Sequence, residues 1–191
     1  MTLTRRSSLV AVTMAVADAL GRHRVQAVLT GGACAALHTN GAYVSKDIDF
    51  VVQGRATRAQ VDGALAEVGF TRTGDRYRHP DVPYYVEFPA GPLGIGADLD
   101  ITPVTVTRSG RRALALSATD SCRDRLAAFY HWNDRQSLKL AVDIAVRARV
   151  NRARIRRWSE SEGFAAEYGE FERRLADRTR RKAVAPRTRA G

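Results

Sequence analysis

The first third of the chain alternates short apolar runs with glycine-containing turns, a pattern typical of mixed α/β proteins. Residues 8–22 carry apolar side chains at helical spacing, which predicts an amphipathic helix. Residues 25–29 are predicted to form a short buried strand that runs directly into Gly31 and Gly32. The alanine-rich residues 33–38 then suit a short helix. The predicted order is strand, glycine pair, helix.

Residues 47–52 follow a polar loop and alternate between apolar and polar positions, which predicts a second strand. One face of this strand is apolar, and the other presents the carboxylates of Asp47 and Asp49. Beyond it, the pattern predicts a helix and then four strands, at residues 57–68 and at residues 70–78, 82–88, 98–107 and 112–116. A loop rich in Gly and Pro spans residues 89–96.

The rest of the chain has helical periodicity. The pattern predicts two longer helices followed by two shorter amphipathic ones: one capped by Thr119 or Asp120 through Tyr130, one capped by Asn133 or Asp134 to about residue 150, and two around Trp158 and Phe171. We therefore expect a mixed α/β core at residues 1–117 and a helical region at residues 118–182 packed on it. Residues 183–191 are expected to form a disordered basic tail.

Composition narrows the class of protein. The chain has 191 residues, 45% of them hydrophobic, with a net charge of +11, which excludes an intrinsically disordered, collagen-like or disulfide-scaffold protein. No apolar run is long enough to span a membrane, so we expect a soluble, cytoplasmic protein without a membrane partner. Cys34 and Cys122 lie in no metal-binding motif, and two buried thiols are expected.

The positive charge is concentrated at the C-terminal end. Residues 147–191 contain 14 Lys and Arg against 6 Asp and Glu, so this quarter carries +8 of the total charge. Such a surface attracts phosphate backbones through counterion release, which makes a nucleic acid the expected partner. The alternative is a solvated helical face followed by a basic tail.

Gly31, Gly32, Asp47 and Asp49 together predict a site for metal and phosphate. Two carboxylates at positions i and i+2 of a strand point to the same face, where their repulsion is relieved by a cation. Oxygen ligands of this kind suit Mg²⁺, which completes its coordination with water and substrate phosphates. A glycine pair between a strand and a helix lets backbone N–H groups approach those phosphates.

At this point the sequence resembles the nucleotidyltransferases of the polymerase-beta type, in particular the AbiEii/MenT-like toxins of bacterial toxin/antitoxin systems. The similarity rests on the glycine pair, on Ser45-Lys46-Asp47-Ile48-Asp49-Phe50 and on a second block at residues 124–138, and it covers about residues 25–175. It implies an α/β (α+β) fold with a nucleotidyltransferase-type mixed sheet flanked by helices and a C-terminal helical bundle. It also implies two Mg²⁺ ions, with an NTP as co-substrate.

The resemblance implies further site residues. A third metal-binding carboxylate is expected at Glu87, with Asp98 or Asp100 as the alternative. A basic residue that contacts the triphosphate falls on Arg123 or Arg125, and an acid that organises the site falls on Asp134; many relatives have Lys in place of Arg123. Ser45 and Lys46 join Gly31 and Gly32 as residues expected to bind the phosphates. Structural roles are expected for His38, His79 and His131, and core positions for Phe129, Tyr130 and Trp132. The alternative for an aromatic residue exposed beside the site is to stack a base.

The function implied is transfer of NMP from an NTP to the 3′ acceptor end of tRNA, which would block aminoacylation and growth. A cognate antitoxin protein is then an implied partner. Two alternatives remain open: a nucleotidyltransferase acting on a protein or small-molecule acceptor, as in an AMP-adding antitoxin or an aminoglycoside-like enzyme, and a non-catalytic RNA-binding module on the same fold.

Overall fold

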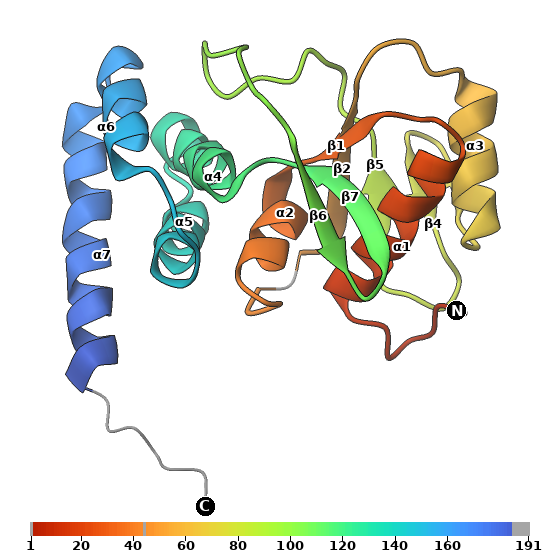
Figure 1. Ribbon diagram of the computed structural model, residues 1–191, viewed down its shortest axis with the longest axis horizontal. Helices are drawn as coiled ribbons and strands as arrows, with labels where there is room; N and C mark the ends of the chain where they lie inside the picture. Colours follow the sequence, from red (N-terminus) through yellow and green to blue (C-terminus); the bar gives the residue numbers. More distant parts are fainter. Residues whose placement is uncertain (1, 44, 185–191) are drawn as a thin grey trace, which may run out of the picture.

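The computed structural model describes residues 2–43 and 45–184, which form a mixed sheet flanked by helices (Figure 1). The sheet has seven strands in the order β3-β4-β5-β2-β1-β7-β6. The strands are β1 (Ala27–Leu29), β2 (Asp47–Val52), β3 (Thr71–Thr73), β4 (Arg76–Arg78), β5 (Tyr85–Glu87), β6 (Val104–Arg108) and β7 (Arg111–Ala115). The mixed α/β fold class predicted from the sequence is confirmed.

The centre of the sheet contains both parallel and antiparallel pairs. β1 pairs antiparallel with β2 and parallel with β7, whereas β2 pairs parallel with β5. The hairpins β3–β4 and β6–β7 extend the two ends of the sheet. Because β2 lies between β1 and β5, its polar face is flanked by the end of β1 on one side and by β5 on the other.

Seven helices surround this sheet in the described part of the chain: α1 (Leu9–Arg22), α2 (Gly31–His38), α3 (Arg58–Glu67), α4 (Ala118–Trp132), α5 (Arg135–Arg147), α6 (Arg152–Ser161) and α7 (Ala165–Val184). In Figure 1, α4 to α7 gather at one end of the molecule, while α1 and α3 lie at the other. α2 packs on both β2 and α4, and so joins the helical region to the sheet. None of the described helices is long and apolar enough to cross a membrane.

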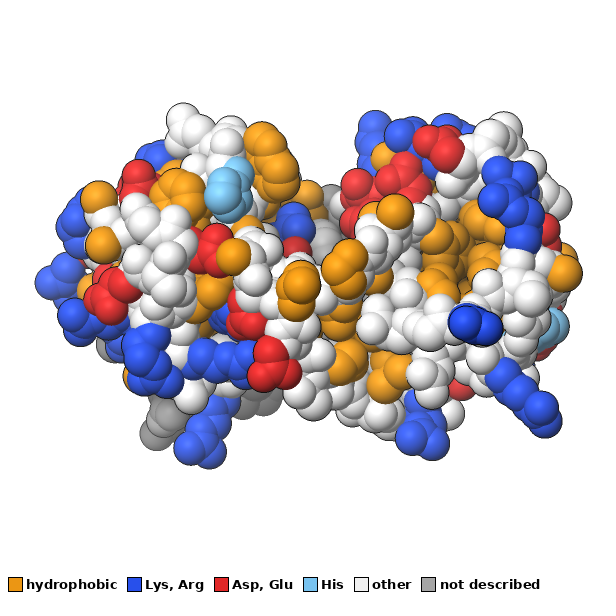
Figure 2. All heavy atoms as spheres, turned by 90° about the horizontal axis from the view of Figure 1, so that it is seen from above, with side chains coloured by type: hydrophobic (Ala, Val, Ile, Leu, Met, Phe, Trp, Pro, Cys, Tyr) orange, Lys and Arg blue, Asp and Glu red, His pale blue; other side chains and the backbone are white. Residues whose placement is uncertain are grey.

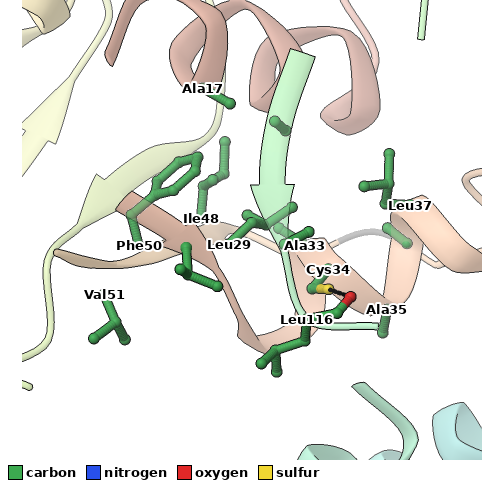
Figure 3. Close-up of a cluster of buried hydrophobic side chains, with 14 of the residues drawn as sticks. Ala17, Leu29, Ala33, Cys34, Ala35, Leu37, Ile48, Phe50, Val51 and Leu116 are labelled. Carbon is green, nitrogen blue, oxygen red and sulfur yellow. Dashed lines mark hydrogen bonds between the residues drawn. The ribbon is translucent and has the colours of Figure 1, made fainter. Parts of the chain in front are cut away.

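The buried side chains of the two regions form one hydrophobic cluster. Figure 3 shows part of it, where Cys34 of α2 points toward Leu116, which lies between β7 and α4; the Cys34 Sγ lies 3.7 Å from the Leu116 carbonyl oxygen. Cys122 of α4 packs against α5, with its Sγ 3.5 Å from the Ala141 carbonyl oxygen. Both thiols are buried, as expected.

Three segments differ from the predicted elements. Residues 70–78 form the β3–β4 hairpin instead of one strand, because Gly74, with a φ of +66°, turns the chain within a polar stretch. Residues 98–103 are not part of a strand, and β6 begins at Val104. α7 continues to Val184, so it includes residues 183 and 184, which were expected to belong to the tail. The remaining tail residues, 185–191, lie outside the described residues.

Candidate active site

The N-terminus of α2 forms one side of the candidate site. α2 begins at Gly31, earlier than predicted, and Gly31 adopts a φ of +67°. A Cβ atom at Gly31 would overlap the carboxylate of Asp49, and a Cβ at Gly32 would press on Ser45 Oγ. Both positions therefore require glycine, and the backbone of α2 lies directly against the carboxylate-bearing face of β2.

The first turn of α2 leaves backbone donors available. Thr30 is the N-cap residue, but its side chain makes no capping hydrogen bond. The first N–H groups of any helix have no acceptor within the helix, and residues 31–33 are buried here. Buried N–H groups without a partner are costly, and the helix dipole adds positive potential at this end. The N-terminus of α2 can therefore bind an anion such as a phosphate.

Three carboxylates share the face of the sheet beside this helix. Asp47 and Asp49 alternate on β2, and the parallel pairing sets Glu87 of β5 level with Asp49. The backbone of Asp49 is fixed by the Thr30 N–H, which donates to the Asp49 carbonyl oxygen at 3.0 Å. The Ser45 hydroxyl donates a hydrogen bond to the carboxylate of Asp47 and orients it.

Asp49 occupies the most unfavourable position for a negative charge. Burial raises the pKa of Asp49 to about 7, and the charges of Asp47 and Glu87 act in the same direction. The positive charge of Arg125 offsets only part of this effect. A cation bound between these carboxylates would relieve the repulsion.

The donor set fits a hard divalent cation such as Mg²⁺. Asp47 and Asp49 provide oxygen ligands from adjacent same-face positions of a rigid strand. The carboxylate of Glu87 instead forms an ion pair with Arg76, at 2.5 Å between Oε1 and Nε. Among the described residues, no three Asp, Glu, His or Cys side chains converge on one point in this arrangement. The geometry therefore offers two protein ligands, with Glu87 held nearby.

α4 supplies the opposite wall. The guanidinium of Arg125 donates to Asp124 at 2.7 Å and reaches Ser137 Oγ at 3.5 Å, and its charge acts on Asp49. Ser137 in turn donates to the carboxylate of Asp134 at 2.7 Å. Burial acts to raise the pKa of Asp134, but hydrogen bonds from Ser137 and Gln136 outweigh it and lower the pKa below its usual range.

Arg123 faces away from this wall. It lies two positions before Arg125, which is about 200° around a helix. Its side chain is 1% exposed and forms ion pairs with Asp98 at 2.5 Å and Asp120 at 2.9 Å, while its guanidinium lies 4.9 Å from the ring centroid of Trp158. Of the two arginines proposed from the sequence, the structure brings Arg125 to the carboxylates of β2 and holds Arg123 elsewhere.

The other residues named from the sequence lie apart from the carboxylates or at the rim. Asp98 binds Arg123 and Asp100 is exposed on a loop, so neither stands beside Asp49 as Glu87 does. The side chain of Lys46 is exposed next to Asp47. His38 Nε2 lies 2.9 Å from the Leu116 carbonyl oxygen, and burial lowers the pKa of His38.

The other two histidines named from the sequence make local contacts. The Asp81 N–H donates to His79 Nδ1 at 3.0 Å, which closes the turn after β4. The ring of His131 is exposed and packs edge-on against Phe164, at 5.0 Å between centroids. Each therefore has an identified structural contact.

One aromatic residue contradicts the sequence-based expectation. Phe129 and Tyr130 are buried as predicted, but Trp132 is 77% exposed at the last residue of α4. The helix ends there because Asn133 adopts a left-handed conformation and Asp134 caps α5. Trp132 therefore extends from the end of the helix instead of packing beneath it.

Sequence reasoning missed two polar groups of the site. Asp124 pairs with Arg125 and adds negative charge near Asp49, and Ser137 links Arg125 to Asp134. Asp124 is the first residue of the second block that resembles the family, residues 124–138, so the sequence did mark its position as a candidate. Ser137 carried none, because serine on a helix is common and only the structure shows its two partners.

A basic groove runs between α5 and α7, beginning two residues beyond Ser137. Six cationic side chains line it, with only two acids among them: Lys139, Arg147, Arg174, Arg178, Arg181 and Lys182, with Asp143 and Asp177. Asp143 pairs with Arg178 at 3.5 Å. Arg147, Arg181 and Lys182 make no ion pair with any residue that the structure describes. The groove therefore retains excess positive charge.

Figure 2 shows a hollow between the sheet and the C-terminal helices. Acidic side chains gather on the wall formed by the sheet region, and hydrophobic and histidine side chains lie on the opposite wall. This hollow is called the cleft below.

Comparison with known proteins bears on the fold. No family model and no curated protein matches the sequence. Among solved structures, a nucleotidyltransferase-like antigenic protein from Paracoccidioides brasiliensis is similar over 74% of this chain and 76% of its own, with a TM-score of 0.56 and 18% identity. The antibiotic-resistance factor ANT(2'')-Ia matches over 85% of this chain and 97% of its own, with a TM-score of 0.49 and 12% identity. The chain has a nucleotidyltransferase-like fold.

Proposed function

We propose that the protein is an NTP-dependent nucleotidyltransferase that transfers NMP to the 3′ acceptor end of tRNA. The observation that carries the transfer chemistry is the contact between the uncapped N-terminus of α2, at Gly31, and the carboxylate of Asp49. A helix N-terminus binds phosphate, and two carboxylates that repel each other bind the cation that accompanies phosphate. Their direct contact suits a metal-bound nucleoside triphosphate.

Different residues of the site bind and orient this substrate. The amides of residues 31–33 donate to phosphate oxygens, and Arg125 adds a charged donor from the opposite wall. Ser45 holds the carboxylate of Asp47 in a fixed orientation, and Lys46 supplies charge at the rim. Bound Mg²⁺, held by Asp47 and Asp49 with Glu87 beside them, would supply positive charge against the triphosphate.

The reaction is an in-line substitution at the α-phosphorus. The acceptor hydroxyl oxygen forms a bond to this phosphorus as the bond to the leaving pyrophosphate breaks, and the hydroxyl proton passes to solvent. The protein contributes orientation and electrostatic stabilisation, which dominate catalysis of phosphoryl and nucleotidyl transfer.

The RNA acceptor is supported by the basic groove. Its excess charge suits a phosphate backbone. The similarity of residues 45–50 and 124–138 to MenT-like toxins favours the tRNA 3′ end as acceptor. Modification of that end would block aminoacylation and growth, and a cognate antitoxin would then restrain the protein.

The test is incubation of the purified protein with total tRNA, Mg²⁺ and each α-labelled NTP in turn, followed by a denaturing gel. We expect label on tRNA with at least one NTP and its loss in Asp49→Ala. Asp81→Ala is the matched control, because Asp81 is an exposed acid in the turn after β4 and is not among the main charges that act on Asp49. Absence of label with every NTP, while tRNA binding is measurable, would reject the tRNA acceptor.

The same experiment separates the rival functions. Label that appears on added protein or on an aminoglycoside, and not on tRNA, would indicate a different acceptor for the same chemistry. Retention of RNA without any NTP-dependent product would indicate a binding module.

A further inference from the structure

Trp132 is the most exposed large hydrophobic side chain in the described part of the chain. Its exposed fraction is 77%, against 62% for Leu99 and 37% for Val104. Tryptophan is highly buried on average, and burial of such a side chain would stabilise the fold. The two preceding aromatic residues of α4, Phe129 and Tyr130, are buried. The fold therefore leaves this one ring available.

Helix geometry sets the direction of Trp132. It follows Arg125 by seven residues on α4, which brings it back to within about 20° of the same face and about 10.5 Å further along the axis. Arg125 is the cationic residue of α4 whose charge acts on Asp49. Trp132 therefore stands on the cleft side of α4, two turns from the candidate phosphate contact.

The backbone that carries Trp132 is held on both sides. His131 packs against Phe164, and Asn133 ends α4 in a left-handed conformation with a φ of 50°. Asp134 then caps α5 by accepting from the N–H groups of Gln136 and Ser137. A fixed backbone leaves only the two side-chain torsions of Trp132 to be ordered on binding, which limits the entropy lost.

The surroundings of Trp132 favour a flat aromatic ligand with a charged tail. Its sequence neighbours His131, Asn133, Asp134 and Arg135 are polar, so it lacks the surrounding apolar residues of a protein interface core. An exposed indole on the same side of α4 as a candidate phosphate contact is an arrangement that can stack a nucleic-acid base.

We propose that Trp132 is the stacking platform for a nucleobase at the mouth of the cleft. This inference rests on the proposed function and names a binding residue for it. The base can belong to the NTP or to the end of the acceptor RNA, and both offer the same aromatic face to the indole. Stacking holds the base while the amides of α2 and Arg125 hold phosphate.

The chain offers a direct spectroscopic test, because it contains two tryptophans and Trp158 is buried at 6% exposure. Tryptophan emission is titrated with each NTP and, separately, with tRNA, for the wild type, Trp132→Phe and Trp132→Leu. Trp132→Phe keeps an aromatic face, whereas Trp132→Leu keeps only apolar surface. Leu99→Ala is the control for loss of an exposed apolar side chain.

We expect ligand to quench the exposed component of the wild-type emission, and Trp132→Leu to bind that ligand about 5- to 150-fold more weakly, the range that one stacked base contributes. Trp132→Phe should recover most of the affinity, and Leu99→Ala should bind like the wild type. Affinities of the variants come from equilibrium dialysis, which does not depend on Trp132 emission. The ligand whose affinity falls identifies the source of the base.

Two results overturn the inference in distinguishable ways. Unchanged affinity of Trp132→Leu for every NTP and for tRNA, with labelled product still formed, rejects stacking and leaves the proposed function standing. A wild-type protein that binds neither NTP nor tRNA rejects both. Loss of affinity in Trp132→Leu that Trp132→Phe does not restore would show that the indole acts otherwise than by stacking.

Discussion

The two faces of α4 differ in the balance of acidic and basic side chains around them. On one face, Arg123 is fully buried between Asp98 and Asp120, and Arg154 lies 3.4 Å from the carboxylate of Asp120. These two cations and two anions balance one another. On the other face, the four acids Asp47, Asp49, Glu87 and Asp124 outnumber their basic neighbours, Arg76 and Arg125.

This contrast distinguishes a structural ion-pair network from a site that awaits a ligand. Balanced charges satisfy one another, and removing one of them affects folding first. Unbalanced charges shift pKa values, as for Asp49, and removing one affects ligand binding first. Arg123 and Arg125 are two residues apart in the sequence, yet they belong to these two different categories.

The largest expected effect is on stability, from Arg123→Met. The substitution leaves Asp120, which is 2% exposed, beside Arg154 alone. Breaking a buried ion pair costs about 3–5 kcal/mol, and we expect the lower end because Arg154 remains. Urea unfolding measures the change. Arg156→Met is the matched control, since Arg156 is exposed and pairs only with Glu160. Equal stability of the two variants would contradict a structural role for Arg123.

The second effect is on nucleotide binding, from Arg125→Gln. Loss of a charged donor to phosphate should weaken NTP binding by about 1.5–3 kcal/mol, or about 10- to 150-fold. Calorimetric titration with a non-hydrolysable NTP measures it, again with Arg156 as the control position. A variant that binds NTP like the wild type would place the phosphates away from Arg125.

The third effect is a pH-dependent stabilisation by Asp49→Asn in the absence of divalent cations. The pKa of Asp49 is raised to about 7 in the folded protein, so the folded state binds more protons than the unfolded state between about pH 4 and 7. Stability contributed by protonated Asp49 is therefore lost as the pH rises through this window. Asn removes the charge and its cost.

We expect Asp49→Asn to be more stable than the wild type by about 2 kcal/mol at pH 8, with a Tm about 4–8 °C higher, and by much less at pH 5. The value is below the full pKa shift because the site is partly solvated. Thermal unfolding at the two pH values measures it, with Asp81→Asn as control. A Tm difference that is independent of pH would contradict the charge imbalance.

The smallest effect is expected from Ser137→Ala. Its hydroxyl donates to Asp134 and accepts from Arg125 at 3.5 Å, so its loss should cost about 1 kcal/mol. The pKa of Asp134 should rise, because its hydrogen bond to Ser137 is the main influence that lowers it. NMR titration of the Asp134 carboxylate measures this shift. An unchanged pKa would show that the α5 amides alone hold this carboxylate.

Much of the fold could be predicted from local pattern. The strand at residues 47–52 was confirmed at both ends because polar and apolar residues alternate over residues 47–50 and a buried face depends on this alternation. The β3–β4 hairpin was missed because residues 71–78 are polar and largely exposed, so no apolar alternation marks its two strands. The strand predicted from residue 98 was wrong over residues 98–103, where Asp98 instead binds Arg123.

The site was less predictable where it depends on orientation. Gly31, Asp47 and Asp49 could be grouped because a strand and a following turn fix their relation. The choice between Arg123 and Arg125 depended on how α4 is rotated against the sheet, which involves contacts distant in sequence, such as that of Arg123 with Asp98, 25 residues away. The exposure of Trp132 depends on its place at the last residue of α4. The run of aromatic residues from Phe129 to Trp132 does not show which of these side chains are buried.

The two buried thiols have a practical consequence for following the folding of the molecule. Burial raises the pKa of Cys34 to about 12 and raises that of Cys122 as well, so neither forms the reactive thiolate near neutral pH in the native state. Cys34 lies where α2 packs against Leu116, just before α4, and Cys122 lies where α4 packs against α5.

The alkylation rate of each cysteine therefore reports the local opening of one of these two contacts. The two rates can be resolved by peptide mass. The rate at Cys34 reports separation of the sheet region from the helical region, and the rate at Cys122 reports separation of α4 from α5. Matching rates would mean that the chain opens as one cooperative unit, and a faster Cys122 would mean that the helical region loosens while the phosphate-binding turn of α2 stays closed.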